Sequence, residues 1–192
     1  MRGLGIIGLA LLAALWAAAQ EHWLGWAFPV HMLRHMTLVA VVSPLLVLGF
    51  PGLAERIAFP PIAGAALEFV AVWAWHLPGM HGLAYTSPAG FALEQASFLV
   101  AGLLVWAGAL RAEHPLAGAG ALLLTSMHMT LLGALLILAP RDLYAAICGL
   151  TPNLTAQQFG GLLMLAIGTP IYLIGGLWLV ARSLRGHEET VP

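Results

Sequence analysis

Residues 117–139 read AGAGALLLTSMHMTLLGALLILA, a run without aspartate, glutamate, lysine or arginine. A helix of about 20 apolar residues is long enough to cross the hydrocarbon core of a bilayer. Five further apolar runs cover about residues 3–19, 29–50, 61–80, 89–110 and 157–181. Because these runs are continuous and do not alternate in polarity, they predict helices and argue against a membrane β-barrel. We therefore expect an all-α, polytopic membrane bundle of about six transmembrane helices.

The composition of the 192-residue chain agrees with this class. Hydrophobic residues make up 61% of the chain and charged residues 8%, with no lysine, whereas soluble domains carry about 25% charged residues. A net charge of -1 gives no nucleic-acid-binding footprint. The single cysteine, Cys148, excludes an internal disulfide and a multi-cysteine metal site. The short connections leave residues 1–192 as one transmembrane helical domain.

The arginines predict how the bundle is oriented. One set of connections and chain ends holds Arg2, Arg56, Arg111, Arg182 and Arg185, and the opposite set holds only Arg141. Because cytoplasmic loops are enriched in basic residues, both termini should be cytoplasmic. The first run, followed by Trp16-Ala-Ala-Ala-Gln20, also fits a secretory signal. Residues 1–20 are thus a signal-like segment or a first helix.

Histidines are the unusual residues of these apolar runs. His31 and His35 are four residues apart, which places both rings on one face of a helix. Ionisable groups are costly inside a membrane and mark functional sites, and imidazole is the commonest metal ligand. His76 ends the third run on the same predicted outer side, and His128 lies mid-way along the fifth. We expect a metal site formed by His31, His35, His76 and His128, with His81 in an outer loop.

Methionines near these histidines suggest which metal the site would bind. They are Met32, Met36, Met80, Met127 and Met129. Thioether and imidazole ligands together suit copper, as Cu(I). Each methionine or single histidine also has a simpler interpretation as core packing or as an interfacial residue. Glu68 could pair with Arg34 or be a neutral hydrogen-bonded carboxyl, and Arg141 could pair locally with Asp142.

Other functions remain open at this stage. His35 and His76 could ligate one haem in an electron-transfer protein. A chain of His, Glu and Arg groups could serve a transporter, although the polar groups gather on one side. No nucleophile–base pair or phosphate-binding loop is present, so an enzyme is not expected.

Five motifs, in order, resemble the multi-pass CtaG-type cytochrome c oxidase assembly factors of bacteria. They are HMLRHMTL (31–38) continuing to SPLLVLG (43–49), WAWHLP (73–78), LEQASF (93–98), MTLLGALLILAPRDLY (129–144) and QQFGGLLM (157–164). The resemblance covers about residues 30–175. Where the family commonly has a histidine after the glutamate of the fourth helix, this chain has Gln95, and Ala156 replaces an acidic residue before the glutamines. These departures weaken any ligand role for the fourth helix.

The resemblance implies a protein of the bacterial cytoplasmic (inner) membrane that assists maturation of a terminal oxidase. It implies copper binding near the outer face and delivery to the oxidase copper site. The partners expected from it are the lipid bilayer and either an oxidase subunit or a copper-donor protein.

Overall fold

The computed structural model describes residues 2–17, 27–148 and 153–188, and every regular element in these ranges is helical. Four long helices are α1 (Arg2–Ala17), α5 (Pro61–His76), α7 (Pro88–Arg111) and α8 (Pro115–Leu138). Two further long helices are each interrupted by a π-helical segment. The first runs through α2 (Ala27–Met36), η2 (Thr37–Val42) and α3 (Ser43–Gly49), and the second through α10 (Leu154–Leu163), η3 (Met164–Gly168) and α11 (Thr169–Glu188). Three short helices, α4 (Pro51–Arg56), α6 (Pro78–Thr86) and α9 (Ala145–Cys148), lie in the connections.

The six predicted apolar runs correspond to these six helices, and the all-helical class is confirmed. Four helical stretches are long and apolar enough to cross a membrane: Phe28–Gly49, Pro88–Arg111, Pro115–Leu138 and Leu154–Arg185. The helices α1 and α5 are apolar but shorter, with 16 residues each. Six crossings and cytoplasmic termini therefore stay predictions. The cleavage site considered for a signal segment falls within residues 18–26, outside the described residues.

Prolines set where several helices begin. Pro61, Pro78, Pro88 and Pro115 each occupy the first position of a helix, where the missing N–H costs no hydrogen bond. The Ser87 hydroxyl also caps α7 by accepting a hydrogen bond from the Gly90 N–H at 3.2 Å. The starts of these helices are therefore determined by the local sequence.

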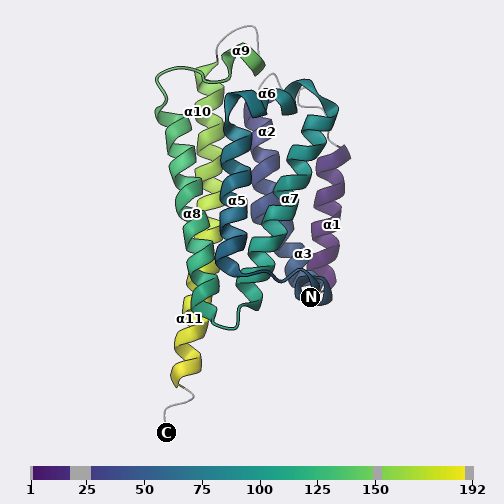
Figure 1. The fold of residues 1–192 in the computed structure, drawn as a ribbon, viewed down its shortest axis with the longest axis vertical. Helices are drawn as coiled ribbons and strands as arrows, with labels where there is room; N and C mark the ends of the chain where they lie inside the picture. The colour runs from purple at the N-terminus through teal and green to yellow at the C-terminus, as the bar shows by residue number, and fades with distance from the viewer. Residues whose placement is uncertain (1, 18–26, 149–152, 189–192) are drawn as a thin grey trace.

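The helices form a bundle whose two ends differ (Figure 1). The short helices α6 and α9 lie at one end, here called the α6–α9 end. The start of α1 and the last turns of α11 lie at the opposite end, which we call the α4 end after the short helix that follows α3. Helix α8 packs against α5, α10 and α11, α7 packs against α5 and α3, and α1 packs against α3 at one side.

The third helix ends at His76, as the sequence predicts, although the apolar run continues to residue 80. Leu77 takes an extended conformation before Pro78, and the chain turns into α6. A residue that precedes proline disfavours the helical conformation, which explains the break. As a result His81, predicted in an outer loop, lies in α6 and is only 2% exposed.

Candidate metal-binding site

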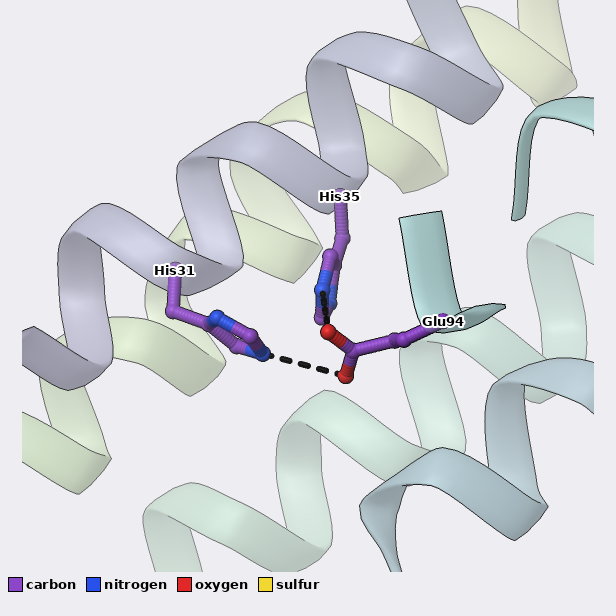
Figure 2. Close-up of side chains that lie close together, drawn as sticks. All are labelled: His31, His35 and Glu94. Atoms are coloured by element: carbon purple, nitrogen blue, oxygen red, sulfur yellow. Dashed lines mark hydrogen bonds and ion pairs between the residues drawn. The ribbon is translucent and has the colours of Figure 1, made fainter. Parts of the chain in front are cut away.

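Two imidazoles and one carboxylate meet between α2 and α7 (Figure 2). His31 and His35 project from the same face of α2, as their spacing predicts, towards Glu94 of α7. The His31 Nε2 lies 3.1 Å from Glu94 Oε1, and the His35 Nε2 lies 3.3 Å from Glu94 Oε2. The two rings stand nearly edge to face, with centroids 4.1 Å apart. The carboxylate thus bridges both histidines.

This cluster has the dimensions of a metal site. One ligand atom from each of His31, His35 and Glu94 lies within 4.8 Å of the other two. Since metal–ligand bonds are about 2 Å long, small side-chain rotations would place all three on one ion. All three side chains are buried. In the described part of the chain, no other group of three histidine, cysteine, aspartate or glutamate side chains is this compact.

Hydrogen bonds around Glu94 fix the carboxylate. The Gln95 side-chain amide donates to Glu94 Oε2 at 3.0 Å, and the Ser97 hydroxyl donates to the Glu94 carbonyl at 2.7 Å. The Trp75 indole of α5 donates in turn to the Ser97 hydroxyl at 2.7 Å. A hydrogen bond to a ligating carboxylate, such as the one from Gln95, orients the ligand and tunes its basicity. Gln95 therefore supports the cluster through Glu94.

His76 forms a second pair with a thioether beside the cluster. Its Nδ1 lies 2.6 Å from the Val72 carbonyl, which can only accept, so the proton of the neutral ring sits on Nδ1. The Nε2 lone pair then faces the Met32 Sδ at 3.3 Å. Two metal-ligating atoms thus face one another with no proton between them. The His76 and His35 ring centroids are 6.2 Å apart.

A layer of aromatic rings, here called the aromatic cap, packs against His31 and consists of Phe28, His81 and Tyr144. The His81 ring lies 4.9 Å from that of His31 and 4.6 Å from that of Tyr144, and Phe28 stacks on Tyr144 at 4.8 Å. The Tyr144 hydroxyl donates to the His76 carbonyl at 2.8 Å. Burial and the neighbouring His31 lower the pKa of the His81 imidazole, so this ring is neutral at pH 7.

The chain matches the family described as cytochrome c oxidase caa3 assembly factor (Caa3_CtaG) over residues 5–186. The chain belongs to this family. The match extends well beyond the five motifs and confirms the resemblance that they indicate. No curated protein and no solved structure shows a significant match.

His128, predicted as a ligand, lies apart from the cluster. Its ring packs edge to face on Phe69 of α5, with centroids 5.3 Å apart. Phe69 precedes His76 by seven residues, about 10 Å along the helix axis. His128 is therefore roughly two turns deeper in the bundle than His76. Within the described residues neither of its ring nitrogens has a hydrogen-bond partner.

The methionines predicted near the histidines also differ in whether they contact a candidate ligand. Met32 contacts His76, and Met36 and Met129 are fully buried in the core. Met127 is 70% exposed and points away from the helix bundle. Met80 is partly buried against the core. Among these five methionines, Met32 is thus the one whose sulfur contacts a candidate ligand in the described residues.

Three other polar residues, Glu68, Arg34 and Asp142, have partners outside the cluster. Glu68 is fully buried and accepts a hydrogen bond from the Tyr172 hydroxyl of α11, which agrees with the predicted hydrogen-bonded carboxyl and not with a pair to Arg34. The Arg34 guanidinium instead lies over the Phe91 ring at 5.1 Å. The Asp142 carboxylate accepts hydrogen bonds from the backbone N–H groups of Tyr144 and Asn153, both at 2.8 Å. It thus links the start of the connection between α8 and α10 to the residue before α10.

Proposed function

We propose that this assembly factor binds a copper ion at His31, His35 and Glu94 and passes it towards the copper site of cytochrome c oxidase. The observation that carries the proposal is the convergence of these three buried ligand atoms from two helices within 4.8 Å. Family membership supplies the process, which is assembly of the oxidase. The ion is cargo in this scheme, and the chain functions as a copper chaperone.

The donor set favours copper over other ions. Calcium takes 6–8 oxygen ligands, and this cluster offers a single carboxylate. Imidazole binds copper, zinc, iron and nickel, whereas a thioether selects Cu(I). The facing His76 Nε2 and Met32 Sδ supply that soft pair next to His35. Neighbouring ligand groups of this kind suit transfer by stepwise ligand exchange.

The proposal also implies a cellular location and a class of partner protein. The ligands lie near the α6–α9 end, the end that the arginine distribution predicts to face outwards. The chain would then work in the bacterial inner membrane, and would receive copper from a donor protein or pass it to an oxidase subunit. No catalytic step is part of this scheme.

Copper analysis of the purified chain tests the assigned ligands. The wild type and the double variant His31→Ala/His35→Ala are purified in detergent with Cu(I) under reducing conditions, and copper is measured by elemental analysis. We expect stoichiometric copper in the wild type and almost none in the double variant. His114→Ala, which alters an exposed histidine at the α4 end, is the matched control and should retain copper. Wild-type copper content in the double variant would refute the site.

Two further measurements distinguish the alternatives. An absorption spectrum without a Soret band is expected, and a Soret band lost in the double variant would favour the haem-binding function. In a strain that lacks this gene, the wild type should restore cytochrome c oxidase activity and the double variant should not. Restoration by the double variant would separate oxidase assembly from copper binding at this cluster.

A further inference from the structure

A groove at the α4 end lies far from the metal cluster and brings together four elements. Its walls come from α3, α4, α7 and α11, and its volume is about 530 Å³. This volume lies within the roughly 300–1,000 Å³ typical of small-molecule sites. Val47, Leu48 and Leu110 form an apolar wall, and Arg111, Arg182 and Trp178 contribute the polar and aromatic groups. The groove is thus amphiphilic.

The charges of the groove are not balanced. Arg111 donates to the Glu55 carboxylate at 3.1 Å and to the Pro51 carbonyl at 3.4 Å. The Arg182 guanidinium lies 5.9 Å from the centre of the Trp178 ring, and among the side chains described in residues 2–16, 28–147 and 153–185 no carboxylate pairs with it. The groove lining therefore contains two guanidinium groups and one carboxylate, Glu55, which pairs with Arg111. Arg182 keeps its hydrogen-bond donors available for an anion.

The groove lies where the long apolar helices end. Helix α7 ends at Arg111, α3 ends at Gly49, and the apolar stretch of α11 ends at Arg185. Trp178 is 48% exposed, and tryptophan is enriched at the level of the lipid headgroups. Apolar and basic groups thus meet at the depth where a phospholipid changes from acyl chain to phosphate.

We propose that this groove binds the headgroup of an anionic phospholipid. The planar guanidinium groups of Arg182 and Arg111 match the geometry of a phosphate, and basic pockets between membrane helices bind such headgroups. Val47, Leu48 and Leu110 offer the adjoining acyl carbons an apolar surface. A free phosphate ion would make no use of that apolar wall, so the lining favours the lipid.

Lipid binding to the intact chain in detergent tests this proposal. Phosphatidylglycerol, phosphatidylcholine and inorganic phosphate are titrated separately, and bound lipid is counted by native mass spectrometry. We expect phosphatidylglycerol to bind more tightly than phosphatidylcholine. Arg182→Gln should weaken its binding about fivefold, because one arginine near the membrane surface contributes about 1 kcal/mol. Arg185→Gln, on the same helix but outside the groove lining, should leave binding unchanged.

Several outcomes would overturn the proposal. Equal binding of the two lipids, or equal weakening by Arg182→Gln and Arg185→Gln, would show that no specific site exists. Competition by inorganic phosphate at equal concentration would identify a free-anion site instead. If Arg182→Gln does not fold, Arg182→Lys keeps the charge but loses the planar fork, and unchanged lipid binding in that variant would contradict the assigned geometry.

Discussion

Glu94 is the residue that makes two histidines into a three-ligand cluster. Its carboxylate reaches His31 Nε2 and His35 Nε2 with different oxygens and is held by the Gln95 amide. A glutamine at position 94 keeps the size of the side chain but removes its negative charge. The positions of the two imidazoles would then be less constrained, and the positive charge of a metal ion would not be balanced.

We therefore expect Glu94→Gln to weaken Cu(I) binding by at least the roughly 10- to 100-fold that loss of a group orienting a metal ligand costs. The measurement is a competition titration against a coloured Cu(I) chelator under reducing conditions. Glu113→Gln changes an exposed carboxylate just beyond the end of α7, and its affinity should equal that of the wild type. Equal affinities for both variants would remove Glu94 from the ligand set.

At the residue scale, spacing predicted one part of the site and tertiary packing decided the rest. His31 and His35 share a face because the helical period fixes it. Glu94 joins them only because α7 packs beside α2, which no local pattern reveals. The available signal was a carboxylate placed two turns into an apolar helix, an expensive position that predicts a functional role. The sequence places His81 in an outer loop because it predicts the helix break at Pro78 but not the short helix α6 that follows it.

The two π-helical segments share a sequence feature. Each directly precedes a residue followed by proline: Ser43-Pro44 after η2, and Thr169-Pro170 after η3. Proline cannot donate the usual helical hydrogen bond, and a widened turn is one way to accommodate it. In η2 the Val39 carbonyl accepts hydrogen bonds from the Trp106 indole at 3.0 Å and the Tyr172 hydroxyl at 3.1 Å. The widened turn therefore ties α7 and α11 to the same backbone atom.

Tyr172→Phe should destabilise the bundle. The phenol hydroxyl, which has one proton, lies within hydrogen-bonding distance of both the Val39 carbonyl and the buried Glu68 carboxyl. The loss of a partner to a buried polar group costs about 1–3 kcal/mol. Glu68→Gln keeps an acceptor for this hydroxyl and should cost less. Thermal unfolding in detergent compares the three proteins, and a wild-type Tm for Tyr172→Phe would show that these hydrogen bonds add no stability.

Close approach of α7 and α8 depends on Gly118. A Cβ atom at this position would overlap the Ala109 backbone carbonyl, whereas nothing lies within 4 Å of a Cβ at Gly120, two residues further along α8. We expect Gly118→Ala to destabilise the protein by about 1–3 kcal/mol through overpacking. Gly120→Ala should be neutral or stabilise it by up to about 1 kcal/mol. Equal unfolding temperatures for the two variants would contradict the packing.

At the element scale the sequence was informative because length and polarity decide a membrane helix. All six apolar runs correspond to helices, and the prolines account for most of the helix starts. The short helix α6 was missed because its nine residues continue the apolar character of α5. The π-helical segments were missed because a proline inside an apolar run does not itself specify how the turn adapts.

For the whole molecule, the arginine distribution predicts which end faces out of the cell. Cysteine labelling checks this in a Cys148→Ser background. Gly79→Cys, in α6, should react with a membrane-impermeant maleimide in intact cells. Glu113→Cys, between α7 and α8, should react only after permeabilisation. Both positions are exposed, and a Cβ at Gly79 meets nothing within 4 Å. The reverse labelling pattern would invert the predicted orientation.

The sequence also predicted that polar groups gather towards one end, but not which of them meet. His128 was grouped with the other histidines because its depth could be read only from its position along the chain. The packing of α8 against α5 sets its actual neighbour, Phe69, well below His76. Which ligands converge depends on how the helices pack. The sequence alone therefore does not distinguish His128 from the other three predicted ligands.

The aromatic cap bears on how quickly an ion can leave. His31, His35 and Glu94 are at most 4% exposed. His81 packs beside His31, and Phe28 and Tyr144 pack in turn on His81. An external chelator cannot reach these ligands until the surrounding helices separate, so opening of the protein should limit the rate of exchange. We expect copper to be lost at a rate independent of chelator concentration, with His81→Ala accelerating it. A rate proportional to chelator concentration would mean that the bound ion is open to solvent. If the cluster holds copper as proposed, release of the ion would then require a movement of the helices around it.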